Sequence, residues 1–243
     1  MQPDLAFCPF EVERAVMLHR WERLTFLHWS YEPAEVQRLL PPGLTVEPFE
    51  GRAWVGLVPF VMHVATRGGR SVPWAADFCE TNVRTYVHDR DGRVGIWFFS
   101  LDAARLGAVA VARATYRLPY FWSQMRVEWS EDRIDYWCRR RRPGPVGAKS
   151  AVSVEIGAPY EPNELGDLDH FLTAKWILFS ASGRRRRFAR AWHAPWPLHH
   201  ATVLDCHDEL VEAAGLSTPR GDPLVHYSPG VAVRIGQPER YGN

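Results

Sequence analysis

The side chains best suited to chemistry lie in one segment, residues 80–88 (Glu-Thr-Asn-Val-Arg-Thr-Tyr-Val-His). Because side chains alternate between the two faces of a strand, one face carries an acid, an amide, a guanidinium, a phenol and an imidazole: Glu80, Asn82, Arg84, Tyr86 and His88. Glu80 and Arg84 would lie roughly 13 Å apart on one strand and cannot pair directly. Such groups are buried only when each finds a partner or a ligand. Two interpretations stay open: this face forms a solvated or internally satisfied network, or it lines a ligand pocket.

The other candidate residues are histidines and cysteines near the C-terminal end. His193 precedes Pro195-Trp196-Pro197 and either lies at the rim of a pocket or caps and packs against its neighbours. Zinc-binding residue types occur at His199, His200, Cys206 and His207, but these residues lie too far apart along one strand to converge. The four cysteines of the chain form no CxxC pair. We therefore expect no metal and no other cofactor.

The basic residues are almost all arginines, because only Lys149 and Lys175 of the 29 are lysines. Lys175 has apolar neighbours, and a lysine in such a setting usually packs its stem and extends its ammonium group to water. Two arginine runs, 139–142 and 184–187, resemble nucleic-acid patches in isolation. Only alternate members of a run share a strand face, and the net charge is just +1. We expect both runs to be solvated.

Length and composition predict a single folded domain over residues 1–243. Apolar residues make up 46% and charged residues 23%, which excludes a disordered or coiled-coil chain. The balanced charge gives no reason to expect nucleic acid or an anionic membrane as partner. The longest apolar stretch, 53–62, is too short to span a membrane. The N-terminal segment contains Asp4, Glu11 and Glu13, whereas a signal peptide has a basic start and an uninterrupted apolar core. We therefore expect a cytoplasmic protein.

The pattern of polar and apolar residues predicts about ten strands with a few short helices. The clearest hairpin joins 78–88 to 93–101 through Asp89-Arg90-Asp91-Gly92. Helices are predicted near 33–40, 102–113, 167–172 and 208–214, the second of them capped by Asp102. A sheet of so many strands normally curls on itself, because a long open edge invites aggregation. We predict a mainly β (α+β) fold: a single antiparallel β-barrel or cone with an internal cavity.

Aromatic residues make up 13% of the chain, including 11 tryptophans. Large rings with a polar edge suit the wall of a small-molecule pocket, and they also fill wide cores. A closed sheet of this size encloses either packed side chains or a ligand cavity. Composition alone leaves both interpretations open.

Seven strings of this chain resemble, in order, those of the uncharacterised bacterial YqjF-like family, also called domain of unknown function 2071. The match spans roughly residues 20 to 235, and the strings are the segments 21–29, 39–44, 51–60, 80–87, 95–102, 118–120 and 193–198. That family is similar to acetoacetate decarboxylase, whose fold is an antiparallel β-cone or barrel around an internal cavity. The resemblance thus implies an acetoacetate decarboxylase-like domain, but it implies no reaction for this family.

The resemblance also directs attention to two residues. Acetoacetate decarboxylase forms a Schiff base through a lysine that follows a proline on a strand, and a glutamate lines its cavity beside that lysine. The corresponding string here, 117–120, places Tyr120 at the lysine position, and a phenol cannot form an imine. Glu80 is the residue most similar to the cavity glutamate.

Two functions are therefore carried forward. In the first, the protein binds a small, partly apolar, anionic molecule in an internal cavity, with Asn82, Arg84, Tyr86 and His193 as ligand-binding residues. In the alternative, it is a lyase or decarboxylase-like enzyme without the Schiff-base lysine, acting on a keto acid or an enolisable substrate through Glu80 and Tyr120. The expected partner is a small molecule, with no nucleic acid or membrane, and self-association into a homo-oligomer stays open.

Overall fold

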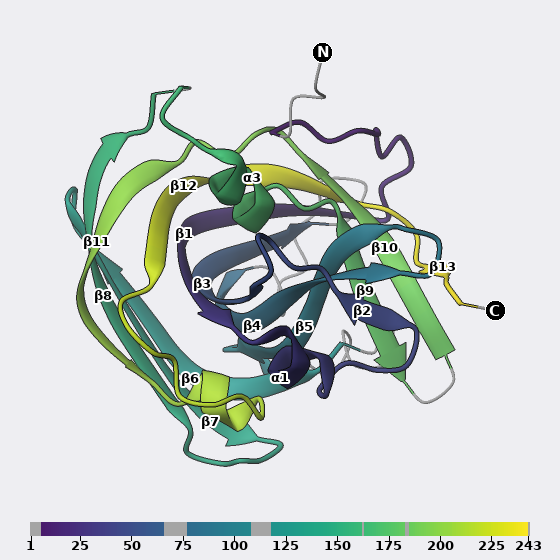
Figure 1. Ribbon diagram of the computed structural model, residues 1–243. Coiled ribbons are helices and arrows are strands. Elements are labelled where there is room, and N and C mark those ends of the chain that lie inside the picture. Colours follow the sequence, from purple (N-terminus) through teal and green to yellow (C-terminus); the bar gives the residue numbers. More distant parts are fainter. Residues whose placement is uncertain (1–5, 66–76, 108–117, 162, 183–184, 243) are drawn as a thin grey trace.

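The computed structural model describes residues 6–65, 77–107, 118–161, 163–182 and 185–242 (Figure 1). Thirteen strands form one sheet. Seven of them are β1 (Met17–Tyr31), β2 (Leu44–Val46), β3 (Ala53–Ala65), β4 (Asp77–Asp89), β5 (Val94–Ala103), β6 (Tyr120–Trp129) and β7 (Arg133–Arg142). The others are β8 (Lys149–Pro159), β9 (Ile177–Ser182), β10 (Arg185–His193), β11 (His199–Asp208), β12 (Leu224–Ile235) and β13 (Glu239–Arg240). The predicted mainly β fold is confirmed.

The labelled helices are short: α1 (Pro33–Gln37), α3 (Asp167–Thr173) and α4 (Leu210–Ala213). None of the helices in the described ranges is long and apolar enough to cross a membrane. The helix predicted over 102–113 is wrong at its start, because Asp102 and Ala103 are the last residues of β5. Residues 108–113 of that prediction lie outside the described part of the chain.

The sheet closes on itself in two places. Its order is β13-β10-β9-β5-β6-β7-β8-β11-β12-β1-β3-β4-β2, and β4 also pairs with β5 while β10 also pairs with β12. Strands β12, β1, β3, β4 and β5 therefore belong to two closed rings. One ring is completed by β9 and β10, which we call the cavity ring, and the other by β6, β7, β8 and β11, which we call the packed ring. Figure 1 shows β8 and β11 on one side of these shared strands and β9 and β10 on the other.

Two strand pairs differ from the predicted antiparallel arrangement. β5 runs parallel to β6, with Leu101 opposite Tyr120, and parallel to β9, with Ile96 opposite Leu178. Parallel neighbours need a long connection, and residues 104–119 separate the end of β5 from the start of β6. The β4–β5 hairpin is antiparallel as predicted, with Glu80 opposite Ala103 and His88 opposite Val94.

Over residues 24–29 of β1, 55–60 of β3 and 80–87 of β4, the shared strands are buried on both faces, because each face turns toward the interior of one ring. On β1, Phe26 packs in the core of the cavity ring, whereas Leu27 and Trp29 pack in the core of the packed ring. Double burial also explains the apolar stretch 53–62, which is part of β3. Gly56 is required there, since a Cβ atom at this position would lie 2.7 Å from Nε2 of His28.

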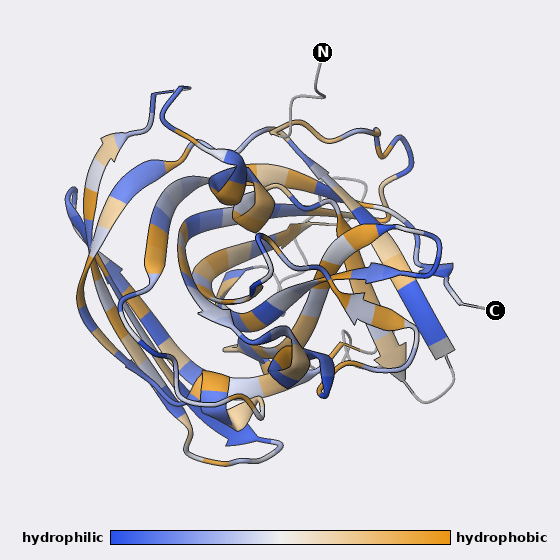
Figure 2. Cartoon of the chain, viewed as in Figure 1, coloured by the Kyte–Doolittle hydropathy of each residue, from blue (hydrophilic) through white to orange (hydrophobic). Residues whose placement is uncertain are grey.

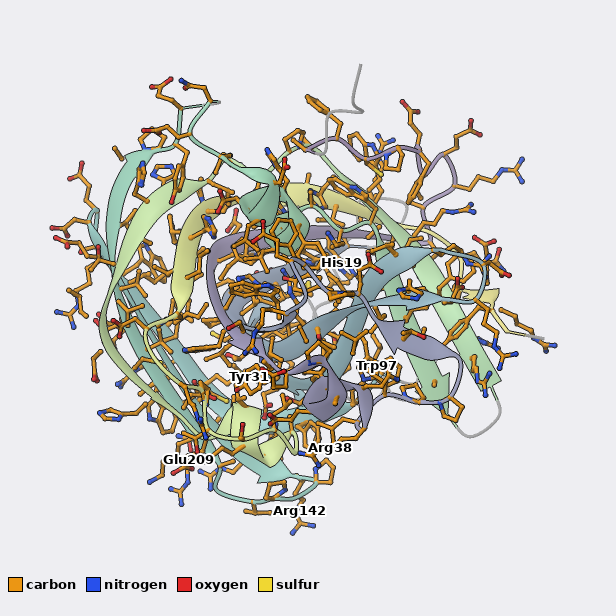
Figure 3. The ribbon with its side chains drawn as sticks, in the orientation of Figure 1. His19, Tyr31, Arg38, Trp97, Arg142 and Glu209 are labelled. Atoms are coloured by element: carbon orange, nitrogen blue, oxygen red, sulfur yellow. The ribbon has the colours of Figure 1, made fainter. Side chains whose placement is uncertain are left out.

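The walls outside the shared strands turn one face to solvent. Along β8 and β11, hydrophilic and hydrophobic residues alternate (Figure 2). Figure 3 shows side chains filling the interior of the ribbon, while Arg142 and Glu209 project from its rim. A cluster of buried side chains from the shared strands and from β7 and β8 packs inside the packed ring, including Leu27, Ile134 and Val154.

A buried ion pair lies inside the packed ring. The Arg140 guanidinium donates to both carboxylate oxygens of Asp102, with Nε–Oδ1 at 2.9 Å and Nη2–Oδ2 at 2.6 Å, and both side chains have 0% exposure. Ser123 donates a further hydrogen bond to Asp102, and Arg140 stacks on the Phe121 ring at 3.8 Å. The prediction that the run 139–142 is solvated is therefore wrong for Arg140, whose charge has a dedicated carboxylate partner.

We expect Arg140→Met to lower the free energy of unfolding by about 3–5 kcal/mol, because it leaves the Asp102 carboxylate buried without its partner. Adding Asp102→Asn in the same chain should recover part of this loss. Urea denaturation monitored by tryptophan fluorescence measures both changes. Arg133→Met is the matched control, since Arg133 pairs with Asp135 at the exposed surface and should change stability little. Equal effects of the two arginine substitutions would contradict the importance assigned to the buried pair.

Candidate functional site

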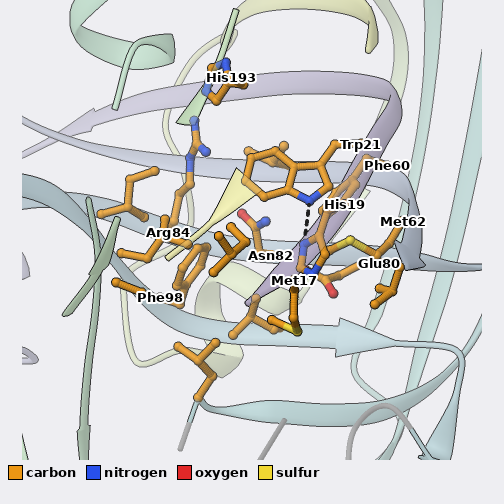
Figure 4. Close-up of a pocket in the computed structure, with 18 of the residues that line it drawn as sticks. Met17, His19, Trp21, Phe60, Met62, Glu80, Asn82, Arg84, Phe98 and His193 are labelled. Carbon is orange, nitrogen blue, oxygen red and sulfur yellow. Dashed lines mark hydrogen bonds between the residues drawn. The ribbon is translucent and has the colours of Figure 1, made fainter. Parts of the chain in front are cut away.

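The cavity ring encloses a cavity of about 290 Å³. Its wall is largely aromatic and aliphatic, including Trp21, Phe60, Met62, Phe78, Phe98 and Trp196. Trp21 stacks on Trp196 with ring centroids 6.2 Å apart and an interplanar angle of 18°. These contacts hold the rings against the wall, so the space is bounded by packed side chains (Figure 4). The aromatic residues therefore do both of the things that composition left open: some fill a core, and others line a cavity.

Five of the residues singled out from the sequence line this cavity: Glu80, Asn82, Arg84, Tyr120 and His193. The first three share one face of β4, as alternation predicted, while Tyr120 begins β6 and His193 ends β10. Tyr86 lies farther along the same face of β4, is buried and contacts Arg84. His88 is only partly buried and pairs with Glu47. The structure thus brings Glu80, Asn82 and Arg84 to the cavity, whereas Tyr86 and His88 are not among the residues that line it.

Glu80 and Tyr120 form a hydrogen-bonded pair in the wall. The Tyr120 hydroxyl donates to Oε2 of Glu80 at 3.0 Å, and Glu80 is 1% exposed. Burial raises the pKa of Glu80 to about 8; the hydrogen bond from Tyr120 acts against this shift, and the nearby Asp102 carboxylate adds to it. At neutral pH the carboxyl group is therefore mostly protonated and can donate a hydrogen bond into the cavity. Burial also holds the Tyr120 pKa well above its ordinary value.

Arg84 is a buried cation at another part of the wall. Its Nη2 donates to the backbone carbonyl of Leu172 at 3.0 Å and lies 3.5 Å from the Tyr86 hydroxyl. Tyr86 in turn contacts Nε2 of His28 at 2.7 Å. Nε of Arg84 is buried without a partner, and in the described part of the chain no carboxylate pairs with this guanidinium. A buried charge normally has a counter-ion, so this position fits an anionic group.

Lys175 lies in a different environment from the one predicted from the sequence. Its ammonium group was expected in water, but the residue lies between α3 and β9 and lines the cavity. Nζ donates to the carbonyl of Phe171 and lies 4.4 Å from the centre of the Phe171 ring. Burial lowers the Lys175 pKa to about 7, the neighbouring Arg84 lowers it further, and Glu47 opposes the shift. The segment leaves α3 and turns inward, so Lys175 does not occupy the exposed strand edge that its apolar neighbours suggested.

His19 is a second cavity residue that the sequence analysis missed. Strand β1 begins at Met17, so that His19 and Trp21 belong to it and line the cavity. Nε1 of Trp21 donates to Nδ1 of His19 at 3.3 Å, which leaves the proton of the neutral ring on Nε2. That atom is buried without a partner, as is Oδ1 of Asn82. The same polar–apolar alternation, extended toward residue 17, would have found it.

The histidines of the cavity wall are neutral over the physiological range. Burial lowers the pKa of His19 and of His193 to about 4 in each case. The His193 ring packs between Trp176 and Trp196, with centroid distances of 4.5 and 4.7 Å, and its Nδ1 contacts the carbonyl of Ala194. Figure 4 shows the Arg84 side chain extending toward His193. A neutral ring beside Arg84 adds no further positive charge to this part of the cavity.

The described residues contain no group of three or more histidine, cysteine or acidic side chains placed to hold a metal ion. Of the histidines on β11, His200 lies 3.5 Å from Glu164, and His207 lies 3.4 Å from Asp205. Each pair is on the exposed side of the strand. The site is therefore built from hydrogen-bonding groups and charges on an apolar wall.

The comparisons with known proteins agree with this architecture. The sequence model of the family DUF2071, described as an uncharacterized conserved protein, matches residues 18–232. The uncharacterized protein YqjF of Bacillus subtilis (strain 168) is 33% identical over 214 residues, which are 88% of this chain and 87% of that protein. This confirms the resemblance stated from the seven strings.

Solved structures are similar in fold at low sequence identity. An acetoacetate decarboxylase-like enzyme from Sphingomonas wittichii RW1 has a TM-score of 0.66 at 12% identity, covering 96% of each chain. The enduracididine biosynthesis enzyme MppR complexed with pyruvate has a TM-score of 0.65 at 13% identity, covering 96% of this chain and 93% of that one. These likenesses show a fold of the acetoacetate decarboxylase type.

We expect Glu80→Gln to stabilise the protein at alkaline pH. Between about pH 4.5 and 8 the folded chain keeps the Glu80 proton that the unfolded chain has lost, so this group makes stability fall as pH rises. Glutamine removes the dependence, and its advantage over glutamate should grow by roughly 3 kcal/mol between pH 5 and pH 8. Urea denaturation at the two pH values measures it. Glu128→Gln, at an exposed position of β6, is the control; the same pH trend in both variants would refute the assignment.

Proposed function

We propose that this chain, which belongs to the DUF2071 family of uncharacterized conserved proteins, binds a small, partly apolar, anionic molecule. The binding site is the cavity, and the closed sheet around it acts as a β-cone or barrel whose interior is reserved for the ligand. Asn82, Arg84 and His193 contact the ligand, and Tyr86 holds Arg84 in place. We further propose that the protein works in the cytoplasm.

The observation that carries the proposal is the position of Arg84. Its guanidinium is 6% exposed, lines an apolar cavity and forms no ion pair with the described residues. A charge held in such surroundings is costly unless an opposite charge meets it. An anionic ligand supplies that charge, and the planar fork of an arginine fits a carboxylate particularly well.

The remaining features set the size and polarity of the ligand. A cavity of about 290 Å³ is at the small end of the usual range of ligand pockets. The aromatic wall suits an apolar body. The unpartnered Oδ1 of Asn82 accepts a hydrogen bond and the protonated Glu80 donates one. The MppR neighbour binds pyruvate, which supports a small carboxylate as the class to test first.

We propose an enzyme as the second candidate, favoured by the protonated state of Glu80. A neutral carboxyl group paired with a tyrosine can hydrogen-bond the oxygen of a keto acid or another enolisable substrate and stabilise the negative charge that develops there. Glu80 then acts as the acid and Tyr120 as the second donor. The acetoacetate decarboxylase-like neighbours support this reaction class, although the sequence resemblance implies a tyrosine, Tyr120, where acetoacetate decarboxylase has its Schiff-base lysine.

The binding proposal is tested with 3-phenylpropanoate and its neutral analogue 3-phenylpropanamide by isothermal titration calorimetry at pH 6.5. We expect the carboxylate to bind at least tenfold more tightly than the amide, a difference of about 1.4 kcal/mol, and Arg84→Met to abolish this preference. Arg93→Met, in the turn between β4 and β5, is the control, because Arg93 pairs with Asp89 outside the cavity. Thermal melting verifies the fold of each variant, and Arg84→Lys retains the charge. Equal binding of carboxylate and amide by the unmodified protein would contradict the proposal.

The enzyme candidate is tested by incubating the protein with a panel of keto acids and following substrate loss and proton exchange by NMR. We expect Glu80→Gln to reduce turnover at least 100-fold while leaving 3-phenylpropanoate bound. No turnover with any member of the panel would remove this candidate. Borohydride reduction in the presence of pyruvate is the accompanying check, since a stable adduct on Lys175 would replace the Glu80 route with an imine route.

A further inference from the structure

Two cations converge on the same end of the cavity from different elements. Arg84 reaches there from β4 and Lys175 from the segment after α3, and both line the cavity. They donate to consecutive carbonyl groups, Arg84 to Leu172 and Lys175 to Phe171. Both also lie near one ring, since Cζ of Arg84 is 5.8 Å and Nζ of Lys175 is 5.4 Å from the centre of Tyr86. The two groups therefore line one cavity and contact the same ring and the same end of α3.

No carboxylate neutralises this pair within the described ranges. Neither Arg84 nor Lys175 takes part in an ion pair there. Glu47 is the acidic residue that acts on Lys175 electrostatically, but its Oε2 is occupied by Nδ1 of His88 at 2.6 Å. Glu80, the acidic residue of the cavity wall, keeps its proton at neutral pH. The carbonyl groups at the end of α3 accept hydrogen bonds from the two cations but supply no full negative charge.

We propose that Arg84 and Lys175 together bind the anionic group of the ligand, and that Lys175 takes up a proton from solution when the ligand binds. The inference rests on the proposed function, because it specifies how that same cavity receives its anion. It adds Lys175 to the ligand-binding residues. It also makes the affinity for anions depend on pH, whereas the affinity for neutral molecules of the same shape stays constant.

Proton uptake is expected because ligand binding changes the sign of the electrostatic potential at Lys175. In the empty cavity, burial and the permanent charge of Arg84 oppose the ammonium form and lower the Lys175 pKa to about 7. An anion placed between the two groups attracts the ammonium form instead, and this attraction is stronger in a partly desolvated site than in water. The pKa of Lys175 then returns toward its ordinary value of 10.5. Above pH 7, each ligand bound must therefore bring one proton to the amine.

The other titratable groups around the pair are accounted for. Burial holds the His193 pKa at about 4 and the His28 pKa well below its ordinary value, so both rings stay neutral. Burial raises the pKa of Tyr86, so its hydroxyl stays protonated. His226 on β12 pairs with Asp169 of α3 at 2.9 Å. Glu80 does change charge near pH 8, and its carboxylate would also repel an anion, so the test needs a chain without it.

The experiment therefore uses Glu80→Gln as the common background and compares it with two further variants in that background, Lys175→Met and Lys175→Arg. Titration calorimetry with 3-phenylpropanoate between pH 6 and pH 9, in two amine buffers that differ in ionisation enthalpy, gives the affinity and the number of protons taken up. With Lys175 present, we expect the affinity to fall by up to tenfold per pH unit above pH 7 and up to one proton to be taken up. Lys175→Met should bind weakly at every pH, and Lys175→Arg tightly at every pH, both without proton uptake.

The outcomes separate this inference from the function on which it rests. If 3-phenylpropanoate binds and the additional substitution Arg84→Met weakens it, but the pH slope persists in Lys175→Met, then only the role of Lys175 is overturned. If no variant binds the carboxylate more tightly than 3-phenylpropanamide at pH 6, the proposed function fails and this inference fails with it. Thermal melting checks that Lys175→Met is folded, and Lys175→Arg supplies an independent second variant with the opposite expected affinity.

Discussion

Strands β1, β3 and β4 form the wall between the two closed rings of the sheet, and their central residues turn almost none of their side chains to solvent. Each of these central residues must therefore be accommodated in one interior or the other. On β4 the alternation places Val83 in the core of the packed ring and Glu80, Asn82 and Arg84 in the cavity. Polar groups in such a wall have no water to rely on. The hydrogen bonds from Tyr120 to Glu80 and from Arg84 to Leu172, and the unpartnered atoms that remain, follow from this single constraint.

Two ionisable side chains of the cavity, Glu80 and Lys175, have protonation equilibria that are unusual for their residue types. An acid that keeps its proton and an amine that readily loses one share a cavity whose walls are apolar. Low local polarity favours the neutral form of each group, which leaves Arg84 as the charge that persists. Inside the packed ring the same problem has a different solution, because Arg140 and Asp102 neutralise each other in bidentate geometry. One half of the molecule thus balances its buried charge internally, and the other half leaves it available.

The sequence predicted the local patterns well and the long-range ones less well. Period-two alternation was sufficient to place Glu80, Asn82 and Arg84 on one face, and the turn residues after His88 located the β4–β5 hairpin. The local pattern did not predict the role of Asp102. Its suitability as a helix cap can be judged from neighbouring residues, but its partner in the structure, Arg140, lies two strands away in the sheet. The prediction for Lys175 was wrong for a similar reason, because its environment includes Arg84 and Tyr86, which are distant in sequence. Which side of a strand faces which interior is decided by ring closure, and no short window of sequence contains that information.

The β9–β10 hairpin is attached to the other strands of the cavity ring through few paired residues. At one edge this hairpin is joined to β5 through only two paired positions, Ile96 with Leu178 and Trp97 with Phe179. At the other edge it is joined to β12 through three, from Ala191 to His193. The β4–β5 and β1–β3 junctions are far longer, so detaching the β9–β10 hairpin breaks fewer inter-strand hydrogen bonds than parting either of them. Lys175 precedes this hairpin and His193 ends it, so local separation of the strands at these short junctions would shift two residues of the cavity wall.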